Sequence, residues 1–134
     1  MKVTITSDMS RKIDGYIMMP VIQSSVRIVD IPTNACEHID IFNCLDEIKS
    51  ETFLQDISNK LRKNGILSLV GVDSLAMCDS VVNEKVDKKD FVDYVKNKHY
   101  LWDIEEISSK LKIAGLQIIS AKMNGMLYEL KATR

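Results

Sequence analysis

Seven consecutive residues near the middle of the chain, Ile-Leu-Ser-Leu-Val-Gly-Val at positions 66–72, are apolar at almost every position. A strand with one face in water alternates apolar and polar side chains, whereas a strand in the middle of a parallel sheet is apolar on both faces. The run therefore predicts a central buried strand. A chain with such a segment must fold around a sheet, and the rest of the sequence has to supply the neighbouring strands.

Short segments with β-like composition lie on both sides of this run. Four precede it, at residues 3–6, 16–19, 26–29 and 39–42. Near the end of the chain, Asn124–Gly125 separates two further segments, and an Asn-Gly pair in such a place is the strongest short-range signal of a β-hairpin. The hairpin strands are expected over residues 116–122 and 126–131.

Helical patterns occupy the stretches between the later strands. Residues 53–63 carry apolar side chains on one face, with Ser50 as the candidate N-cap and Gly65 as the residue just past the C-terminus. Residues 74–98 predict two further helical pieces. Asp103 and Glu106 form a capping box for another helix, which Gly115 is expected to end.

This order of elements predicts an α/β fold with a mostly parallel, Rossmann-like sheet that closes in an antiparallel hairpin. The 134 residues form a single domain, 1–134. Only nine residues separate Thr6 from Tyr16 and five separate Met19 from Ser25, whereas a parallel crossover with a helix needs a dozen or more. We therefore expect a reduced helical layer over the N-terminal strands, so that one face is thinly covered or is covered by another chain.

Composition excludes several classes of function. Eighteen basic and nineteen acidic side chains give a net charge of -1, which argues against a general polyanion binder, and nucleic acid is not an expected partner. The segment from Lys110 to Arg134 nevertheless holds five basic residues and one acid, a local excess suited to an acidic partner surface. The three cysteines form no CxxC pair, so neither disulfides nor a metal site is expected. No membrane span or signal peptide is evident, which favours an intracellular protein.

Several short motifs, taken in order, resemble a known family. They are Lys-Ile-Asp-Gly-Tyr-Ile at 12–17, Asn-Cys-Leu-Asp-Glu-Ile at 43–48, Leu-Arg-Lys-Asn-Gly-Ile-Leu at 61–67, Trp-Asp-Ile-Glu-Glu-Ile at 102–107 and Ala-Gly-Leu at 114–116. With the closing hairpin, they resemble a small class I S-adenosylmethionine-dependent methyltransferase, of the short type found among polysaccharide-modification genes. The resemblance covers nearly the whole chain and implies a methyltransferase sheet.

The departures from that family lie where its cofactor binds. The family's first strand leads into a glycine-rich loop, but this chain has Thr6, Ser7 and Asp8 there, without a glycine. Pro20 stands where the family's acidic residue binds the ribose hydroxyls, and Asn43 replaces a histidine. These five positions are interpreted as vestiges of a cofactor site. No cofactor and no catalytic residue are expected.

Were the chain an active enzyme, its proton acceptor would be sought among Asn43, Asp46, His38 and His99. The two histidines have no partner that the sequence identifies, and ordinary surface or interface roles are favoured for them. Asp46 and Glu47 are adjacent, so they do not face each other on a helix, and a solvated helix start is the favoured interpretation. Trp102, just before a capped helix, is expected to pack in the core or to anchor a partner.

Two functions from different classes follow. The first is a non-catalytic, methyltransferase-like scaffold that acts as an interaction or assembly module with a protein partner or with further copies of itself, in the cytoplasm or in a virion. The second is an S-adenosylmethionine-dependent methyltransferase acting on a small molecule or sugar. The absent glycines, Pro20 and the thin N-terminal layer favour the first.

Overall fold

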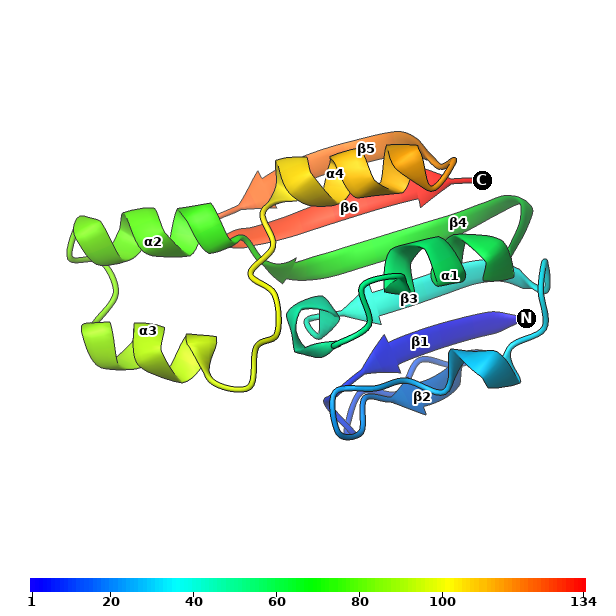
Figure 1. Cartoon of the computed structure of the whole chain (residues 1–134), viewed down its shortest axis with the longest axis horizontal. Helices are drawn as coiled ribbons and strands as arrows, with labels where there is room; N and C mark the ends of the chain where they lie inside the picture. Colours follow the sequence, from blue (N-terminus) through cyan, green and yellow to red (C-terminus); the bar gives the residue numbers. More distant parts are fainter.

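The computed structural model describes all of residues 1–134 and has one six-stranded sheet (Figure 1). The strands, in chain order, are β1 (Lys2–Thr6), β2 (Ile17–Pro20), β3 (Cys36–Phe42), β4 (Leu61–Val72), β5 (Gln117–Asn124) and β6 (Leu127–Thr133). Their order across the sheet is β2-β1-β3-β4-β6-β5. β2, β1, β3 and β4 run parallel, and β6 lies antiparallel to both β4 and β5. The predicted α/β sheet with a closing antiparallel hairpin is confirmed.

The helices cover one face of this sheet and one of its ends. They are η1 (Ile28–Asp30), η2 (Leu45–Glu47), α1 (Phe53–Lys60), α2 (Ser74–Val82), α3 (Lys88–Val95) and α4 (Ile104–Ile113). Figure 1 shows α1 and α4 on the near face, while α2 and α3 project beyond the carboxyl ends of β3 and β4. None of the helices has both the length and the apolar composition needed to cross a membrane.

The core lies between the sheet and the layer of α1 and α4. Alternate residues of the central strands point into it and are almost completely buried: Val3, Ile5, Ile39, Ile41, Leu67, Leu69 and Leu130. Ile57 of α1, and Ile107 and Leu111 of α4, pack on them and are fully buried. This burial of aliphatic side chains on one face is the main force that holds the sheet and helices together.

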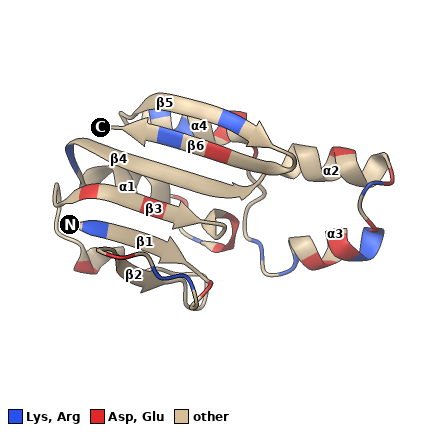
Figure 2. Cartoon of the chain, turned by 180° about the vertical axis from the view of Figure 1, so that it is seen from behind, with Lys and Arg blue, Asp and Glu red and all other residues tan.

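The opposite face of the sheet carries no helix (Figure 2). In β4, Leu67 and Leu69 are buried toward the helices, whereas Ile66 on the other face is 38% exposed and Val70 is half-buried. The expectation that β4 is central is confirmed, but the expectation that both of its faces are buried is wrong. The reason is the short β1–β2 connection, which has no room for a helix, so the reduced N-terminal layer is confirmed as well.

Two element boundaries differ from the prediction. Residues 26–29 do not form a strand, because Val26 and Ile28 turn inward and pack on the core, and η1 follows. The helix predicted to reach residue 63 ends at Lys60. Gly65 does not end it: a Cβ at Gly65 would come within 2.8 Å of the carbonyl oxygens of Arg62 and Cys36, so this glycine permits close backbone contact inside β4.

The two strongest local signals are confirmed. The Asp103 carboxylate accepts a hydrogen bond of 2.9 Å from the Glu106 amide at the start of α4, and Gly115 follows its end with φ +89°. In the β5–β6 hairpin, Asn124 still pairs with Leu127, so the two-residue turn is Gly125–Met126, one residue later than the Asn-Gly pattern predicts. Gly125 has φ +64°, which suits the first position of a type II′ turn.

Candidate functional site

The chain reverses its direction of progress across the sheet between β1 and β3. From β1 it goes outward to β2 and then returns to β3 on the other side of β1. In open α/β sheets, ligands bind at the carboxyl ends of the strands that flank such a switch point. Here those ends are Thr6 and Phe42, which pair with each other across the sheet, and Pro20 pairs with Thr6 from the outer side. The candidate site is therefore built from the residues that follow these three strands.

The loop after β1 is closed by its own side chains. The buried Thr6 hydroxyl accepts a hydrogen bond of 3.0 Å from the Asp8 amide. The Asp8 carboxylate accepts two more, from the Ser10 amide at 3.0 Å and from the Ser10 hydroxyl at 2.6 Å. These bonds to Ser10 lower the pKa of Asp8, so the carboxylate stays charged. The amides of Asp8 and Ser10, which an open loop would present to a ligand, are thus bound within the chain.

Arg11 fastens the end of this loop to the bare face of the sheet. Its guanidinium lies 3.1 Å from the Asp40 carboxylate and 3.8 Å from the centre of the Phe42 ring. The Thr4 hydroxyl donates to the same carboxylate at 2.7 Å. Arg11, Asp40 and Phe42 are residues that the sequence analysis missed. The available signal was Asp40 itself, an acid between two isoleucines in a strand, which requires a partner when buried.

Pro20 is the last residue of β2, which is an outer strand of the sheet. The amide of the next residue, Val21, donates to the Thr6 carbonyl at 3.1 Å and therefore points toward β1. Because successive residues of a strand face alternate sides, the nitrogen of Pro20 points away from the sheet. Pro20 offers neither a side-chain acceptor nor an amide at this end of β2.

Asn43 and Cys44 follow β3 at the switch point. Asn43 is exposed, has φ +50°, and its amide donates to the Val70 carbonyl at 2.6 Å. The buried Cys44 thiol lies 3.4 Å from the Ile5 carbonyl and fills the space between the ends of β1 and β3. Burial raises the pKa of Cys44 to about 12, so this thiol remains protonated. The five predicted positions thus share one end of the sheet, with Ser7 exposed beside the others.

Asp46 was predicted to lie in a solvated helix start, but the fold buries it. It is only 8% exposed and lies 3.4 Å from the ammonium group of Lys98, which follows α3. Its backbone carbonyl also accepts a hydrogen bond of 2.8 Å from the His99 amide. Burial raises the pKa of Asp46, and the Lys98 charge opposes that rise. The prediction failed because the segment after α3 folds back over η2, a contact between residues more than fifty positions apart.

Both histidines have specific partners. His38 lies on the bare face, where its imidazole bonds to the Tyr16 hydroxyl through Nδ1 and to the Ser68 hydroxyl at 2.8 Å through Nε2. Burial lowers the pKa of His38, which favours the neutral ring. His99 bonds to the Ser24 hydroxyl at 2.7 Å. The His38 ring therefore links the β1–β2 connection to β3 and β4, whereas the His99 ring links the segment after α3 to the segment after β2.

An apolar cavity borders the outer side of this switch point. It has a volume of about 540 Å³ and runs along the outer edge of β2 beneath the segment that leads to η1. Its walls are mostly apolar and include Val3, Met18, Met19, Pro20 and Ile31. Of the five positions interpreted as vestiges only Pro20 lines it, so the cavity meets the candidate site at the end of β2 and not in the loop after β1.

The comparisons identify the fold. No family model matches the chain, and no curated protein matches it by sequence. Several solved structures do match its fold. A Haloferax volcanii protein in complex with the Trm112 methyltransferase activator has a TM-score of 0.66 at 7% identity, over 98% of this chain and 81% of that one. An S-adenosylmethionine-dependent methyltransferase of Thermotoga maritima has 0.65 at 14% identity, over 98% and 81%.

A third structure, an S-adenosylmethionine-dependent methyltransferase of Mesorhizobium loti, has a TM-score of 0.65 at 7% identity, over 99% of this chain and 90% of that one. The chain therefore has the fold of the class I S-adenosylmethionine-dependent methyltransferases, as its motifs suggested. At these identities the likeness establishes the fold alone, and function must be argued from the residues of this chain.

Proposed function

We propose that this protein is a non-catalytic, methyltransferase-like scaffold that serves as an interaction or assembly module and does not bind S-adenosylmethionine. The observation that carries the proposal is the closed loop after β1. Asp8 bonds to Thr6 and to Ser10 where the family has a glycine-rich loop, and the backbone amides of Asp8 and Ser10 are already used. The charged Asp8 would also repel the carboxylate of the cofactor's methionine part.

Pro20 supports the same conclusion from the neighbouring strand. An acid at this position would accept two hydrogen bonds from the ribose hydroxyls, and each bond to a charged group contributes about 1.5–3 kcal/mol. At about 1.4 kcal/mol per tenfold in affinity, their loss alone lowers affinity by about a hundredfold or more. The residues present therefore do not fit the cofactor that the fold implies, and we derive no methyl-transfer step.

A protein partner, or further copies of this chain, completes the proposal. The helix-free face of the sheet and the projecting α2–α3 segment leave apolar side chains in water, among them Ile66, Leu75 and Val82. One solved structure of this fold is a complex with an activator protein, so the fold can present a surface to another chain. We also propose that the protein acts in the cytoplasm or in a virion. We infer that it descends from a methyltransferase of the short polysaccharide-modification type.

The test is a calorimetric titration with S-adenosylmethionine and with S-adenosylhomocysteine, accompanied by thermal unfolding with and without each compound. We expect no binding heat and no change in the unfolding temperature at millimolar ligand, because binding to the folded state alone would raise that temperature. Micromolar binding of either compound would overturn the proposal and favour a methyltransferase acting on a small molecule or sugar.

A further inference from the structure

β5 forms an open edge of the sheet, on the side opposite β2. Figure 1 shows it at the margin of the sheet, with no segment beyond it. Seven of its eight residues are exposed, and two of these are large and apolar, Ile119 at 54% and Met123 at 43%. An edge strand of this length without a proline is a template on which another strand can pair. β5 is therefore a surface at which a further chain can add.

The outward backbone groups of β5 have no partner. Asn124 and Leu127 flank a two-residue turn and so form a hydrogen-bonded pair, and the residues before Asn124 point their amides alternately outward and toward β6. The amides of Ala121 and Met123 therefore point away from the sheet, and neither donates to a turn or loop. The irregularity in the pairing of the hairpin lies before Ser120, so this part of β5 is regular.

Two copies of this strand can pair with each other without bringing like charges together. A two-fold axis perpendicular to the sheet makes the two strands antiparallel, so that each contact is made twice. With the axis at Ala121, the outward amide of each copy meets the carbonyl of the other, and Lys122 lies opposite Ser120. The two exposed apolar residues, Met123 and Ile119, also lie opposite each other. Moving the axis to Lys122 would place two ammonium groups directly opposite each other, which is destabilising.

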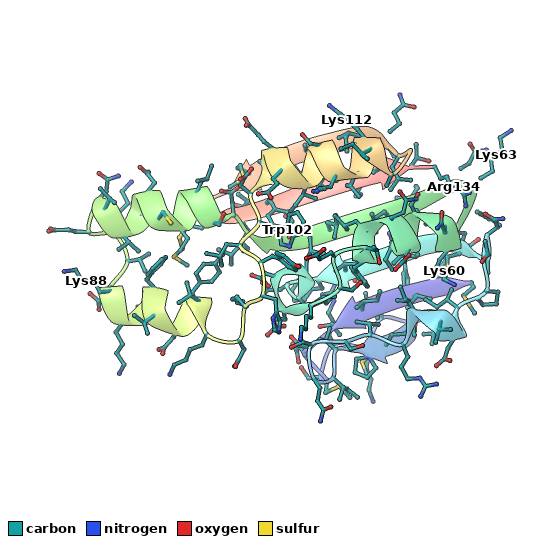
Figure 3. The ribbon with its side chains drawn as sticks, in the orientation of Figure 1. Lys60, Lys63, Lys88, Trp102, Lys112 and Arg134 are labelled. Carbon is teal, nitrogen blue, oxygen red and sulfur yellow. The ribbon has the colours of Figure 1, made fainter.

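α4 lies along β5 on the covered face and adds charges to this edge (Figure 1). Glu105 in its first turn and Lys112 in its last turn are seven residues apart, so they lie on the same side of the helix. Both are exposed, and neither forms an ion pair within the chain. Figure 3 shows that Lys112 points away from α1, toward the margin that β5 forms. One side of α4 thus presents an acid and a base beside the open edge.

The two-fold axis brings these unlike charges together. A tight turn at Gly115 joins α4 to β5, so the helix runs antiparallel to the strand, and the α4 helices of two copies run antiparallel beside the joined strands. The first turn of one helix then lies beside the last turn of the other. Lys112 of each copy meets Glu105 of the second copy, and opposite ends of the two helix dipoles are adjacent. The surface is therefore complementary in charge to itself.

We propose that β5 and the adjacent side of α4 form the interface of a symmetric homodimer, in which two sheets join through their β5 strands and Lys112 pairs with Glu105 of the second copy. We call this surface the β5 edge. The proposal rests on the proposed function as an assembly module and names a second copy of this chain as the partner. The other outer strand, β2, has only four residues and ends in Pro20, so the pairing stops at two copies.

Self-complementarity favours a second copy over an unrelated strand. A strand of any protein could satisfy the free amides of Ala121 and Met123, but Glu105 and Lys112 would then stay unpaired. A second copy satisfies the amides and both charges in one contact. The net charge of -1 per chain is small, so two copies do not repel each other strongly.

The mass in solution is the first measurement. Sedimentation equilibrium of the intact chain should give about twice 15.2 kDa at about 100 μM, and the mass of one chain after dilution to about 1 μM, because association follows mass action. Raising the salt concentration from about 20 to about 500 mM should weaken the dimer by about threefold, since exposed ion pairs are screened.

Amide hydrogen exchange locates the interface. It is followed by mass spectrometry of peptic fragments at the same two protein concentrations. In fragments that cover β5, the two outward amides should exchange at least about tenfold more slowly at the higher concentration, because pairing with a second strand protects them. Fragments that cover β2 are the control and should exchange at the same rate at both concentrations.

Charge reversal tests the contact between the helices. Lys112→Glu and Glu105→Lys should each weaken the dimer by at least about tenfold, since each change makes two attractive pairs repulsive. A one-to-one mixture of the two variants should recover the dimer, because every reversed charge then meets an opposite one. Lys110→Glu is the control, since Lys110 lines the cavity between α1 and α4, and it should leave the affinity unchanged. Thermal unfolding confirms that all three variants fold.

A chain that stays monomeric at about 1 mM rules out the homodimer. A dimer in which β5 exchanges equally fast at both concentrations uses another surface, and one that Lys112→Glu leaves unchanged, or that the mixture fails to restore, lacks the contact with Glu105. Protection of β5 only by an added ten-residue peptide of alternating valine and threonine would assign the edge to a foreign strand. Each of these results overturns the proposal.

The cofactor titration keeps this result separate from the proposed function. A monomer that does not bind S-adenosylmethionine loses the β5 edge as an interface but keeps its function as a scaffold. A protein that binds the cofactor loses the proposed function itself, whatever its mass in solution.

Discussion

Arg11 and Asp40 form an ion pair of 3.1 Å across the helix-free face of the sheet, twenty-nine residues apart in the chain. Asp40 is 7% exposed, and its other close partner is the neutral Thr4 hydroxyl. Arg11 is therefore the only cation that compensates this carboxylate, and it also fixes the end of the loop after β1.

Replacing Arg11 with Ala should destabilise the fold by about 2 kcal/mol, because it leaves a nearly buried carboxylate with one neutral partner. Chemical denaturation with urea measures the loss. Arg27→Ala is the control, since Arg27 also pairs with an aspartate, Asp30, but is exposed, and should cost less than about 0.5 kcal/mol. Equal losses in the two variants would contradict the structural role of Arg11.

Asp46 predicts a specific dependence of stability on pH. Because burial raises its pKa above the ordinary value of 3.8, the folded state binds the proton more tightly than the unfolded state. The stabilisation from this group is therefore present at low pH and is lost as pH rises through the folded pKa. The Asp46→Asn variant has no carboxyl group that titrates at this position. Its free energy of unfolding, relative to that of the wild type, should therefore rise between about pH 4 and about pH 7.

Urea unfolding of both proteins at the two pH values measures that difference. The contributions of the other carboxyl groups cancel, because the two proteins share them. A difference that stays constant with pH, or that changes in the opposite direction, would show that Lys98 outweighs the effect of burial.

The three cysteines should differ sharply in reactivity. Cys78 is exposed, whereas Cys36 and Cys44 are buried and burial raises the pKa of both thiols, to about 12 for Cys44. Since the thiolate is the reactive form, a thiol reagent at pH 8 should modify about one cysteine in the native protein and all three in urea. The Cys78→Ser variant should show no fast phase. Rapid modification of Cys44 would mean that the end of β3 opens readily.

Gly71 in β4 should not tolerate a side chain. A Cβ there would come within 2.5 Å of the Tyr128 hydroxyl and 2.8 Å of its ring, and Tyr128 is buried. Gly71→Ala should cost about 1–3 kcal/mol through overpacking. In a double-mutant cycle, Tyr128→Phe should recover part of that cost because it removes the closest atom. If the losses of stability in the two single variants are strictly additive in the double variant, residue 71 and Tyr128 are not in contact.

The elements that the sequence predicted well are those set by neighbouring residues. Asp103 and Gly115 determine both ends of α4 within one helical turn, and Gly125 sets the hairpin. The thin helical cover over the N-terminal strands was also predictable, because the length of the β1–β2 connection limits what it can hold. In each case the cause lies within about a dozen residues of its effect.

The features that could not be predicted depend on long-range contacts. Val26 and Ile28 have strand-like composition, but burying them on the core outweighs extending the sheet. Arg11 could not be assigned to Asp40, nor Lys98 to Asp46, because opposite charges distant in sequence give no local pattern. The five positions interpreted as vestiges lie at one end of the sheet, but the bonds that close the loop after β1 became visible only in three dimensions.

The outward nitrogen of Pro20 has a consequence for solubility. An outer strand with free amides can pair with the strands of other molecules and so begin aggregation. Every second residue of β2 points its backbone nitrogen outward, and Pro20 occupies one of these positions without an N–H group. The nearest outward amide in the strand is that of Met18, so Pro20 interrupts the row of free donors. Pro20 thus protects a sheet that ends at a short strand. It also makes addition of a strand at β2 an unfavourable route for a partner, which leaves the β5 edge as the better place to dock.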